Sequence, residues 1–122
     1  MGKICEESHL QQAIVRWAKY SGGVNKELAL LYAIPNGAHV GSSNRMRLVA
    51  EGLKKGMPDL CLPVPRGNYG SLFLEVKTKT GTVQKEQREI HKLLEDHGNR
   101  VRVVRDLFQA IDALEAYLNQ PP

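Results

Sequence analysis

The chain has 122 residues, 42% of them hydrophobic and 25% charged, which fits one globular domain over residues 1–122 and excludes a disordered or fibrous protein. No apolar run approaches the ~20 residues of a membrane-spanning helix, and the first residues lack the apolar segment of a secretory signal. The two widely spaced cysteines, Cys5 and Cys61, match no zinc site and favour a cytoplasmic protein. The excess of 17 Lys and Arg over 13 Asp and Glu favours an anionic partner. Cys61 lies in an apolar run, which indicates a buried free thiol.

The first half of the chain predicts two helices and a strand. A helix over residues 6–20 ends at a Ser-Gly-Gly sequence. The apolar run over residues 28–34 favours a buried strand, although part of it also suits a helix, and a Pro-Asn-Gly turn at 35–37 follows. A polar loop over residues 38–43 leads to a short helix over residues 44–53. We expect apolar contacts from Leu10, Ile14 and Trp17 in the first helix and from Met46, Leu48, Val49 and Leu53 in the second.

The second half of the chain predicts a strand pair followed by a crossover. Strands over residues 58–62 and 71–77, joined by a short turn region, favour an antiparallel hairpin. The second strand, a helix over residues 83–97 and a strand over residues 100–104 should form a parallel, right-handed βαβ unit. The fold class is therefore α/β, a central mixed sheet flanked by helices. A last helix has Asp106 as its expected N-cap, and the inward residues of the last two helices are Ile90, Leu93, Leu94, Leu107, Ala110, Ile111, Leu114 and Leu118.

Acidic and basic side chains meet in the predicted hairpin. Alternation along the strand puts Glu75 and Lys77 on one face, roughly 7 Å apart. Asp59, at the start of the partner strand, would lie opposite Glu75 with Cβ atoms roughly 5 Å apart. Two carboxylates this close repel each other unless one is protonated or a cation lies between them, and their oxygens suit Mg²⁺ or Mn²⁺. With Lys77 beside an attacking water, this arrangement is typical of metal-dependent phosphodiester hydrolysis.

The same residues also fit purely structural roles. Glu75 and Lys77 can form a solvent-facing ion pair worth less than ~1 kcal/mol. Asp59, which follows Pro58, can act as a turn cap. The flanking sequence, rather than the three residues alone, therefore has to decide between these readings.

The pattern Pro58-Asp59, then Glu75-Val76-Lys77 about fifteen residues later, resembles the PD-(D/E)XK nuclease superfamily. The segments KKGMPDLCLPV, LFLEVKTKTGTVQKEQ and HGNRVRVVR resemble more closely the VRR-NUC family of that superfamily, over about residues 6–105. This resemblance implies a restriction-endonuclease-like fold and a nuclease activity that depends on Mg²⁺ or Mn²⁺. Short stand-alone members occur often in phages and bacteria, which would place the protein in a bacterial host cytoplasm.

The resemblance also implies roles for residues of the hairpin. Asp59 and Glu75 match the metal-binding acids of the family, and the carbonyl of Val76 matches a backbone metal ligand. Lys77 matches the catalytic lysine, which would position the attacking water.

Two helices supply further candidates by the same resemblance. Gln87 falls where the family has a helix glutamine that orients the lysine or the DNA, and Gln84 is the alternative one turn earlier. A glutamate on the first helix is expected near the metal. Glu7 fits best, with Gln11 one turn along on the same face, and Glu6 is the rival.

The partner implied by the resemblance is DNA. A small nuclease without a separate DNA-reading domain can contact a second strand by pairing with itself, so we expect a homodimer that prefers branched DNA such as four-way (Holliday) junctions. An inactive nucleic-acid-binding module and a restriction-type nuclease remain alternatives. Basic residues would bind backbone phosphates, unless they only form a solvated surface: Arg45, Arg47, Lys54, Lys55 and Lys79.

Overall fold

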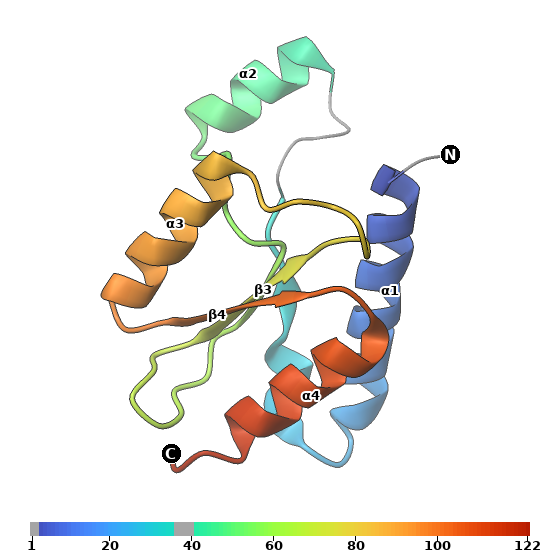
Figure 1. Cartoon of the computed structure of the whole chain (residues 1–122), viewed down its shortest axis with the longest axis vertical. Coiled ribbons are helices and arrows are strands. Elements are labelled where there is room, and N and C mark those ends of the chain that lie inside the picture. Colours follow the sequence, from blue (N-terminus) through green and yellow to red (C-terminus); the bar gives the residue numbers. More distant parts are fainter. Residues whose placement is uncertain (1–2, 36–40) are drawn as a thin grey trace.

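The computed structural model describes residues 3–35 and 41–122, with side chains from Glu6 onward. The turn predicted at 35–37 and the loop predicted over residues 38–43 therefore fall partly outside the described residues. Within the described chain, no helix is both long and apolar enough to cross a bilayer. The elements, in chain order (Figure 1), are α1 (Lys3–Ser21), the 3₁₀-helix η1 (Lys26–Leu30), β1 (Tyr32–Ala33), α2 (Ser42–Ala50), β2 (Leu60–Leu62), β3 (Leu72–Val76), α3 (Lys85–Asp96), β4 (Arg100–Val104) and α4 (Leu107–Leu118).

The strands form one mixed sheet in the order β1-β2-β3-β4. β2 pairs with β1 and with β3 in antiparallel fashion, so the predicted hairpin is confirmed. β4 pairs with β3 in parallel, and α3 makes the connection between them. The structure is thus the predicted α/β fold with a mixed sheet flanked by helices.

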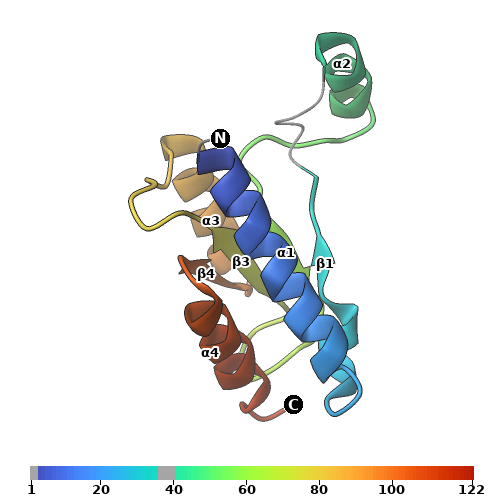
Figure 2. The same ribbon diagram turned by 90° about the vertical axis from the view of Figure 1, so that its right-hand side faces the viewer.

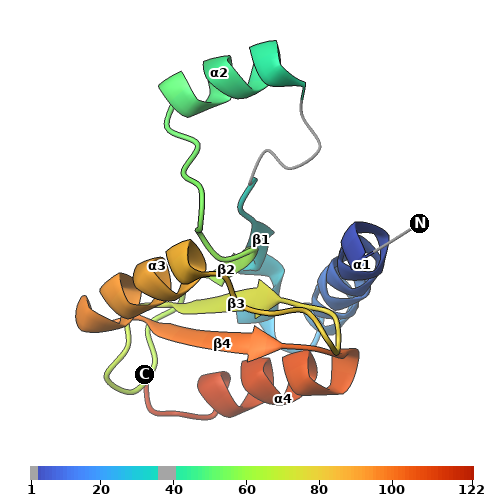
Figure 3. The same cartoon turned by 45° about the horizontal axis from the view of Figure 1, so that its top comes forward.

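The hydrophobic core lies on one face of the sheet. Leu72, Leu74 and Val76 alternate along β3 and pack with Ile14 of α1 and Leu114 of α4. α3 covers the other face, so the residues between these apolar ones point towards a different helix (Figure 3). Cys61 is a buried free thiol, as expected. The alternation of β3 therefore separates a dry core from a polar face.

The prediction of a buried strand over residues 28–34 is wrong. The run forms η1 and then the two-residue strand β1, and only Leu28 of the segment is buried. The Asn25 side chain accepts a hydrogen bond from the Glu27 amide at 3.2 Å, which starts a helical turn where the apolar pattern suggested extended chain. β1 is an edge strand with both residues exposed. A short apolar run does not distinguish these outcomes by its period alone.

The short helix predicted over residues 44–53 exists as α2, but only Leu48 and Leu53 of the four apolar residues are half-buried, and the contacts predicted for Met46 and Val49 are absent. α2 buries no residue, and Met46 and Val49 are 74% and 55% exposed. Figures 1 and 2 show α2 standing away from the sheet and the other helices. Leu93 of α3 is likewise exposed rather than inward. By contrast, Asp106 caps α4 as predicted, accepting a hydrogen bond from the Gln109 amide at 2.8 Å.

Candidate active site

The structure places Asp59 and Glu75 opposite each other. Leu60 pairs with Leu74 in the β2–β3 register, and continuing that register by one residue sets Asp59 against Glu75. The Asp59 amide donates a hydrogen bond to the Leu74 carbonyl at 3.0 Å, so the strand pairing extends to this point. Glu75 is only 1% exposed. The juxtaposition of two carboxyl groups that the sequence predicts is therefore present in the fold.

The two carboxyl groups perturb each other. Burial, followed by the charge of Glu75 and a hydrogen bond to it, raises the pKa of Asp59 to about 8, and Glu7 adds a smaller effect in the same direction. The Val76 amide donates to Asp59 Oδ2 at 2.7 Å and partly opposes this rise. Near neutral pH the pair therefore retains a proton, and a bound cation can replace that proton.

Helix α3 fixes the position of Glu75. Gln87 Nε2 donates to Glu75 Oε2 at 3.4 Å, and His91 Nε2 lies 2.9 Å from Glu75 Oε1. Gln87 Oε1 accepts from the Gln84 amide at 2.8 Å, which ties the same side chain to the start of the helix. Of the two glutamines considered from the sequence, Gln87 is the one that contacts the acid pair, while Gln84 is the N-cap.

Sequence reasoning missed His91. Its side chain is 12% exposed and makes the shorter of the two contacts between α3 and Glu75. The available signal was its spacing: His91 follows Gln87 by four residues, so both lie on one face of α3. A polar residue one turn beyond a candidate site residue, in a helix that covers that site, is a candidate for the same site.

Lys77 lies on the face of β3 that carries Glu75, two residues further on. It is 7% exposed, and its amide donates to the Val104 carbonyl at 3.0 Å, so the backbone is still extended there. Two residues along a strand separate the two side chains by roughly 7 Å. No ion pair joins the Lys77 ammonium to another residue within the described ranges. Its ammonium group therefore has no ion-pair partner among the described residues, on the strand face that carries Glu75.

The loop after Lys77 is held by Arg105, which the sequence analysis also did not identify. Arg105 Nη1 donates to the carbonyls of Thr78 and Gly81 at 2.7 Å each, and to that of Lys79 at 3.4 Å. A Cβ at Gly81 would lie 2.9 Å from Thr78 Oγ1 and 3.6 Å from Glu7 Oε2, so only glycine fits without a shift. These contacts fix the chain where it leaves the site and passes α1.

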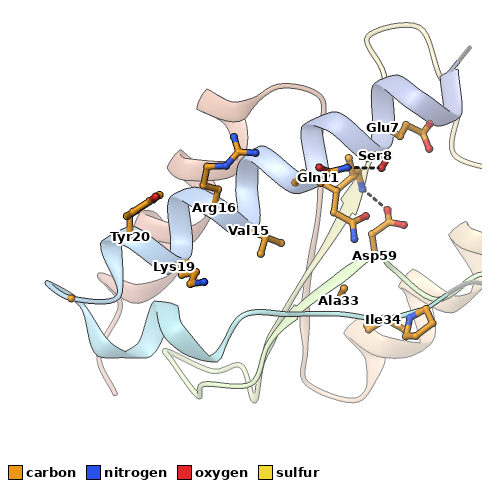
Figure 4. A pocket seen from close by; sticks show the side chains of 14 residues that line it. Glu7, Ser8, Gln11, Val15, Arg16, Lys19, Tyr20, Ala33, Ile34 and Asp59 are labelled. Carbon is orange, nitrogen blue, oxygen red and sulfur yellow. Dashed lines mark hydrogen bonds between the residues drawn. The ribbon is translucent and has the colours of Figure 1, made fainter. Parts of the chain in front are cut away.

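A groove of about 900 Å³ runs from Asp59 along α1 (Figure 4). Glu7, Gln11 and Asp59 line one end of it, together with Val76. Glu6 is exposed and lines a separate depression beside Lys79 and Arg105. Of the two rival glutamates, Glu7 is the one that shares a groove with Asp59.

The basic residues expected to contact DNA are spread over several segments. Arg45 and Arg47 lie on α2, and Arg47 pairs with Glu51 at 3.2 Å. Lys55 pairs with Glu86 of α3 at 3.3 Å, and both groups are largely exposed. Lys54 and Lys79 are exposed, the first between α2 and β2 and the second in the loop after Lys77. Of these five basic residues, only Lys79 lies close in sequence to Glu75 and Lys77, two residues after the latter.

The donor set suits a hard divalent cation. Within residues 3–35 and 41–122, no group of three or more His, Cys, Asp and Glu side chains is placed to hold a metal by itself. The available oxygens are those of Asp59 and Glu75, the Val76 carbonyl and water, which is the type of ligand that Mg²⁺ and Mn²⁺ prefer. Burial first, and then the charge of Glu75, raise the pKa of Asp59, and both causes favour a bound cation in place of the retained proton.

Comparisons with known proteins agree with this geometry. A family model of the VRR-NUC domain matches residues 3–106, which include α1 to β4 and every site residue described above. A solved structure described as a VRR_NUC domain protein superposes with a TM-score of 0.77 at 20% sequence identity, over 94% of this chain and 89% of that chain. At this identity the likeness concerns the fold. None of the curated proteins compared with the chain matches it.

Proposed function

Because the chain belongs to the VRR-NUC domain family, a nuclease class of the PD-(D/E)XK superfamily, we propose that it is a Mg²⁺- or Mn²⁺-dependent DNA endonuclease. One observation carries this proposal: Asp59 and Glu75 face each other across β2 and β3, with Lys77 next along the same face. The acid pair retains a proton near neutral pH, and the Lys77 amine beside it has no ion-pair partner among the described residues. A pair of carboxylates that can bind a divalent ion next to such an amine is suited to hydrolysis of a phosphodiester.

Asp59, Glu75 and the Val76 carbonyl would hold the ion, with Glu7 acting through water. A bound divalent ion supplies a water of lowered pKa and offsets the charge that builds on the phosphate. Lys77 lies where it can orient the attacking water and stabilise the same charge. The water would lose a proton to solvent as its oxygen bonds to phosphorus, and the scissile phosphorus–oxygen bond would break with the leaving oxygen taking up a proton to depart as a hydroxyl group.

Gln87 and His91 would hold Glu75 in the orientation that binds the ion. Both oxygens of Glu75 already have partners on α3, at 3.4 Å and 2.9 Å. Mutation of groups that orient a metal ligand from behind typically lowers metal affinity by about 10–100-fold. These two residues are positioning residues, since they act through Glu75.

We further propose that the protein is a homodimer acting on branched DNA, and helix α2 supports this. A nine-residue helix that fully buries none of its residues has little packing to stabilise it, and isolated helices of this length are marginal in water. Its exposed Met46 and Val49 suit an interface between two copies, while Arg45 and Arg47 on the same helix suit DNA phosphates. A two-fold pair would present two active sites to two strands.

The test is cleavage of a labelled panel (linear duplex, flap, splayed arm and four-way junction) with Mg²⁺, Mn²⁺ or chelator. We expect metal-dependent cutting of branched substrates, abolished in Lys77→Ala while DNA binding persists. Binding without cutting by the natural protein would identify a binding module, and discrete fragments from plasmid DNA a restriction-type enzyme. Light scattering measures the oligomeric state, and a monomer that cuts flaps and junctions equally contradicts the dimer proposal.

A further inference from the structure

The groove along α1 continues well beyond the acid pair. Glu7 and Tyr20 both line it, and thirteen residues of helix separate them, a distance of about 20 Å along the helix axis. Figure 4 shows Glu7 and Asp59 at one end and Lys19 and Tyr20 at the other. Only the first end belongs to the metal site described above. The metal site does not account for the residues that line the rest of the groove.

Charge changes sign along the groove. The acids Glu7 and Asp59 lie at one end, and the cations Arg16 and Lys19 line the other. In the described part of the chain, neither cation forms an ion pair. Six other basic side chains do pair with carboxylates: Arg47, Lys55, Arg66, Lys85, Lys92 and Arg100. The groove cations are therefore available to an anionic ligand.

The walls between these ends carry apolar and aromatic surface. Val15 of α1 faces Ala33 and Ile34 across the groove (Figure 4), and Pro35 also lines it. Tyr20, at the cationic end, is 79% exposed, although an aromatic ring gains by burial or stacking. A row of phosphate-binding cations beside apolar surface and a free aromatic ring is the composition of grooves that bind single-stranded nucleic acid.

We propose that this groove binds one unpaired DNA strand and guides it from Tyr20 to the acid pair. Arg16 and Lys19 contact backbone phosphates, and Tyr20 stacks on a base. The inference rests on the proposed nuclease function, because the acid pair defines where the strand is cut. It adds that a single-stranded arm beside the cleavage point strengthens substrate binding, which a fully paired branch cannot do through this groove. A groove of about 20 Å accommodates about six nucleotides at the 3.4 Å spacing of a stacked strand, and fewer in a stretched one.

A single strand fits this groove better than a duplex for a physical reason. A duplex presents phosphates and stacked, paired bases, which leave an exposed tyrosine and an apolar wall without a partner. An unpaired strand exposes base faces, which stack on aromatic side chains irrespective of sequence. The groove holds no other charged residues than Glu7, Arg16, Lys19 and Asp59 within the described residues.

The experiment compares a groove variant with a charge-matched control. Arg16→Glu/Lys19→Glu reverses the two groove cations, and Lys85→Glu/Lys92→Glu reverses two exposed cations on α3. The probe is a short fluorescein-labelled single strand of mixed sequence, titrated in chelator and followed by anisotropy. We expect the groove variant to bind at least about tenfold more weakly, with the slope of log affinity against log salt reduced by about two, and the control to lose far less.

Tyr20 supplies a second, uncharged test. Tyr20→Ala should weaken binding of the same probe about tenfold, and Tyr20→Phe should preserve it because the ring remains. On a splayed-arm substrate with Mn²⁺, the groove variants should raise KM more than they lower kcat. Circular dichroism establishes that each variant is folded.

The outcomes separate this inference from the function on which it rests. If the natural protein cuts with metal but the groove variants bind the single strand normally, the inference is overturned and the nuclease function stands. Equal losses on blunt duplex and single strand also overturn it, because the groove would then follow duplex backbone. If no metal-dependent cutting occurs but the groove variants lose single-strand binding, the groove assignment holds and the nuclease function fails.

Discussion

Two regions of this protein are expected to meet DNA, and they are built in opposite ways. Around Glu75, the fold supplies partners from another element: both carboxylate oxygens are within hydrogen-bond range of α3, and the side chain is buried. Helix α2 carries Arg45 and Arg47 but buries nothing and stands away from the body (Figure 1). Chemistry requires atoms placed before the substrate arrives. A contact surface can be ordered by its partner, so α2 needs no such support from its own chain.

The largest expected effect comes from the preorganised region. Glu75→Gln should lower the cleavage rate by at least ~10³-fold, about 4 kcal/mol in the barrier, because it removes a negatively charged ligand without changing the shape of the side chain. The variant should remain folded, since glutamine can still bond with His91. Single-turnover cleavage of a labelled four-way junction measures the rate.

The matched control is Glu86→Gln, which changes an exposed carboxylate on α3, the helix that covers Glu75. It should cut at nearly the natural rate. Equal cleavage rates for Glu75→Gln and Glu86→Gln would show that Glu75 is not an active-site residue.

The acid pair also predicts a pH dependence of stability in the metal-free protein. Folding raises the pKa of Asp59 from 3.8 to about 8, so the folded state binds more protons than the unfolded state between these values. The free energy of unfolding should therefore fall as pH rises through this window, by up to ~1.4 kcal/mol per pH unit from this group. Below the window both states are protonated, and the effect disappears.

Denaturant unfolding in chelator at several pH values tests this, with Asp59→Asn as the reference. Subtracting the variant's curve removes the other titrating groups, and the difference should slope downward with pH towards 8. Adding Mn²⁺ at the upper end should restore stability to the natural protein and not to the variant. Parallel curves for the two proteins would contradict the assigned pKa.

The structure of a region is predictable from the sequence where local rules determine it, and is not where contacts with distant parts of the chain determine it. Asp59 and Glu75 could be paired from the sequence, because alternation and hairpin register are local rules that the fold obeys. The apolar spacing of Met46 and Val49 predicts burial, but both side chains are exposed. The prediction fails because spacing does not say whether the rest of the chain supplies a surface to pack against. The sequence predicts which face of a helix is apolar, whereas the surface against which that face packs depends on the whole fold.

The site residues missed from the sequence are those whose roles depend on long-range contacts. Arg105 holds carbonyls more than twenty residues earlier in the chain, and His91 reaches Glu75 across the layer between α3 and the sheet. For Arg105 no local pattern indicates this role, and for His91 the only local indication is its four-residue spacing from Gln87. Their roles become visible only once β3, α3 and β4 are placed side by side.

A smaller effect should follow from removing the support behind Glu75. His91→Ala should weaken Mn²⁺ binding by about 10–100-fold, because Glu75 loses the contact that fixes its orientation. His91→Gln, which keeps a donor, should recover part of the affinity. Isothermal titration with Mn²⁺ measures the affinity without turnover, and Lys92→Ala on the exposed side of α3 is the control. Unchanged affinity in His91→Ala would show that Gln87 suffices.

Substitutions in α2 are expected to change the unfolding free energy least. They contrast in this respect with substitutions in the hydrophobic core. Met46→Ser/Val49→Ser should alter the unfolding free energy of the monomer by less than ~0.5 kcal/mol, because neither side chain is buried. The core substitution Leu114→Ala, at a fully buried position, should cost about 2–5 kcal/mol. The α2 variant should nevertheless weaken self-association at least tenfold by sedimentation or light scattering. If it destabilises the monomer as much as the core substitution does, then α2 packs against its own chain in solution and cannot serve as the surface that joins two copies.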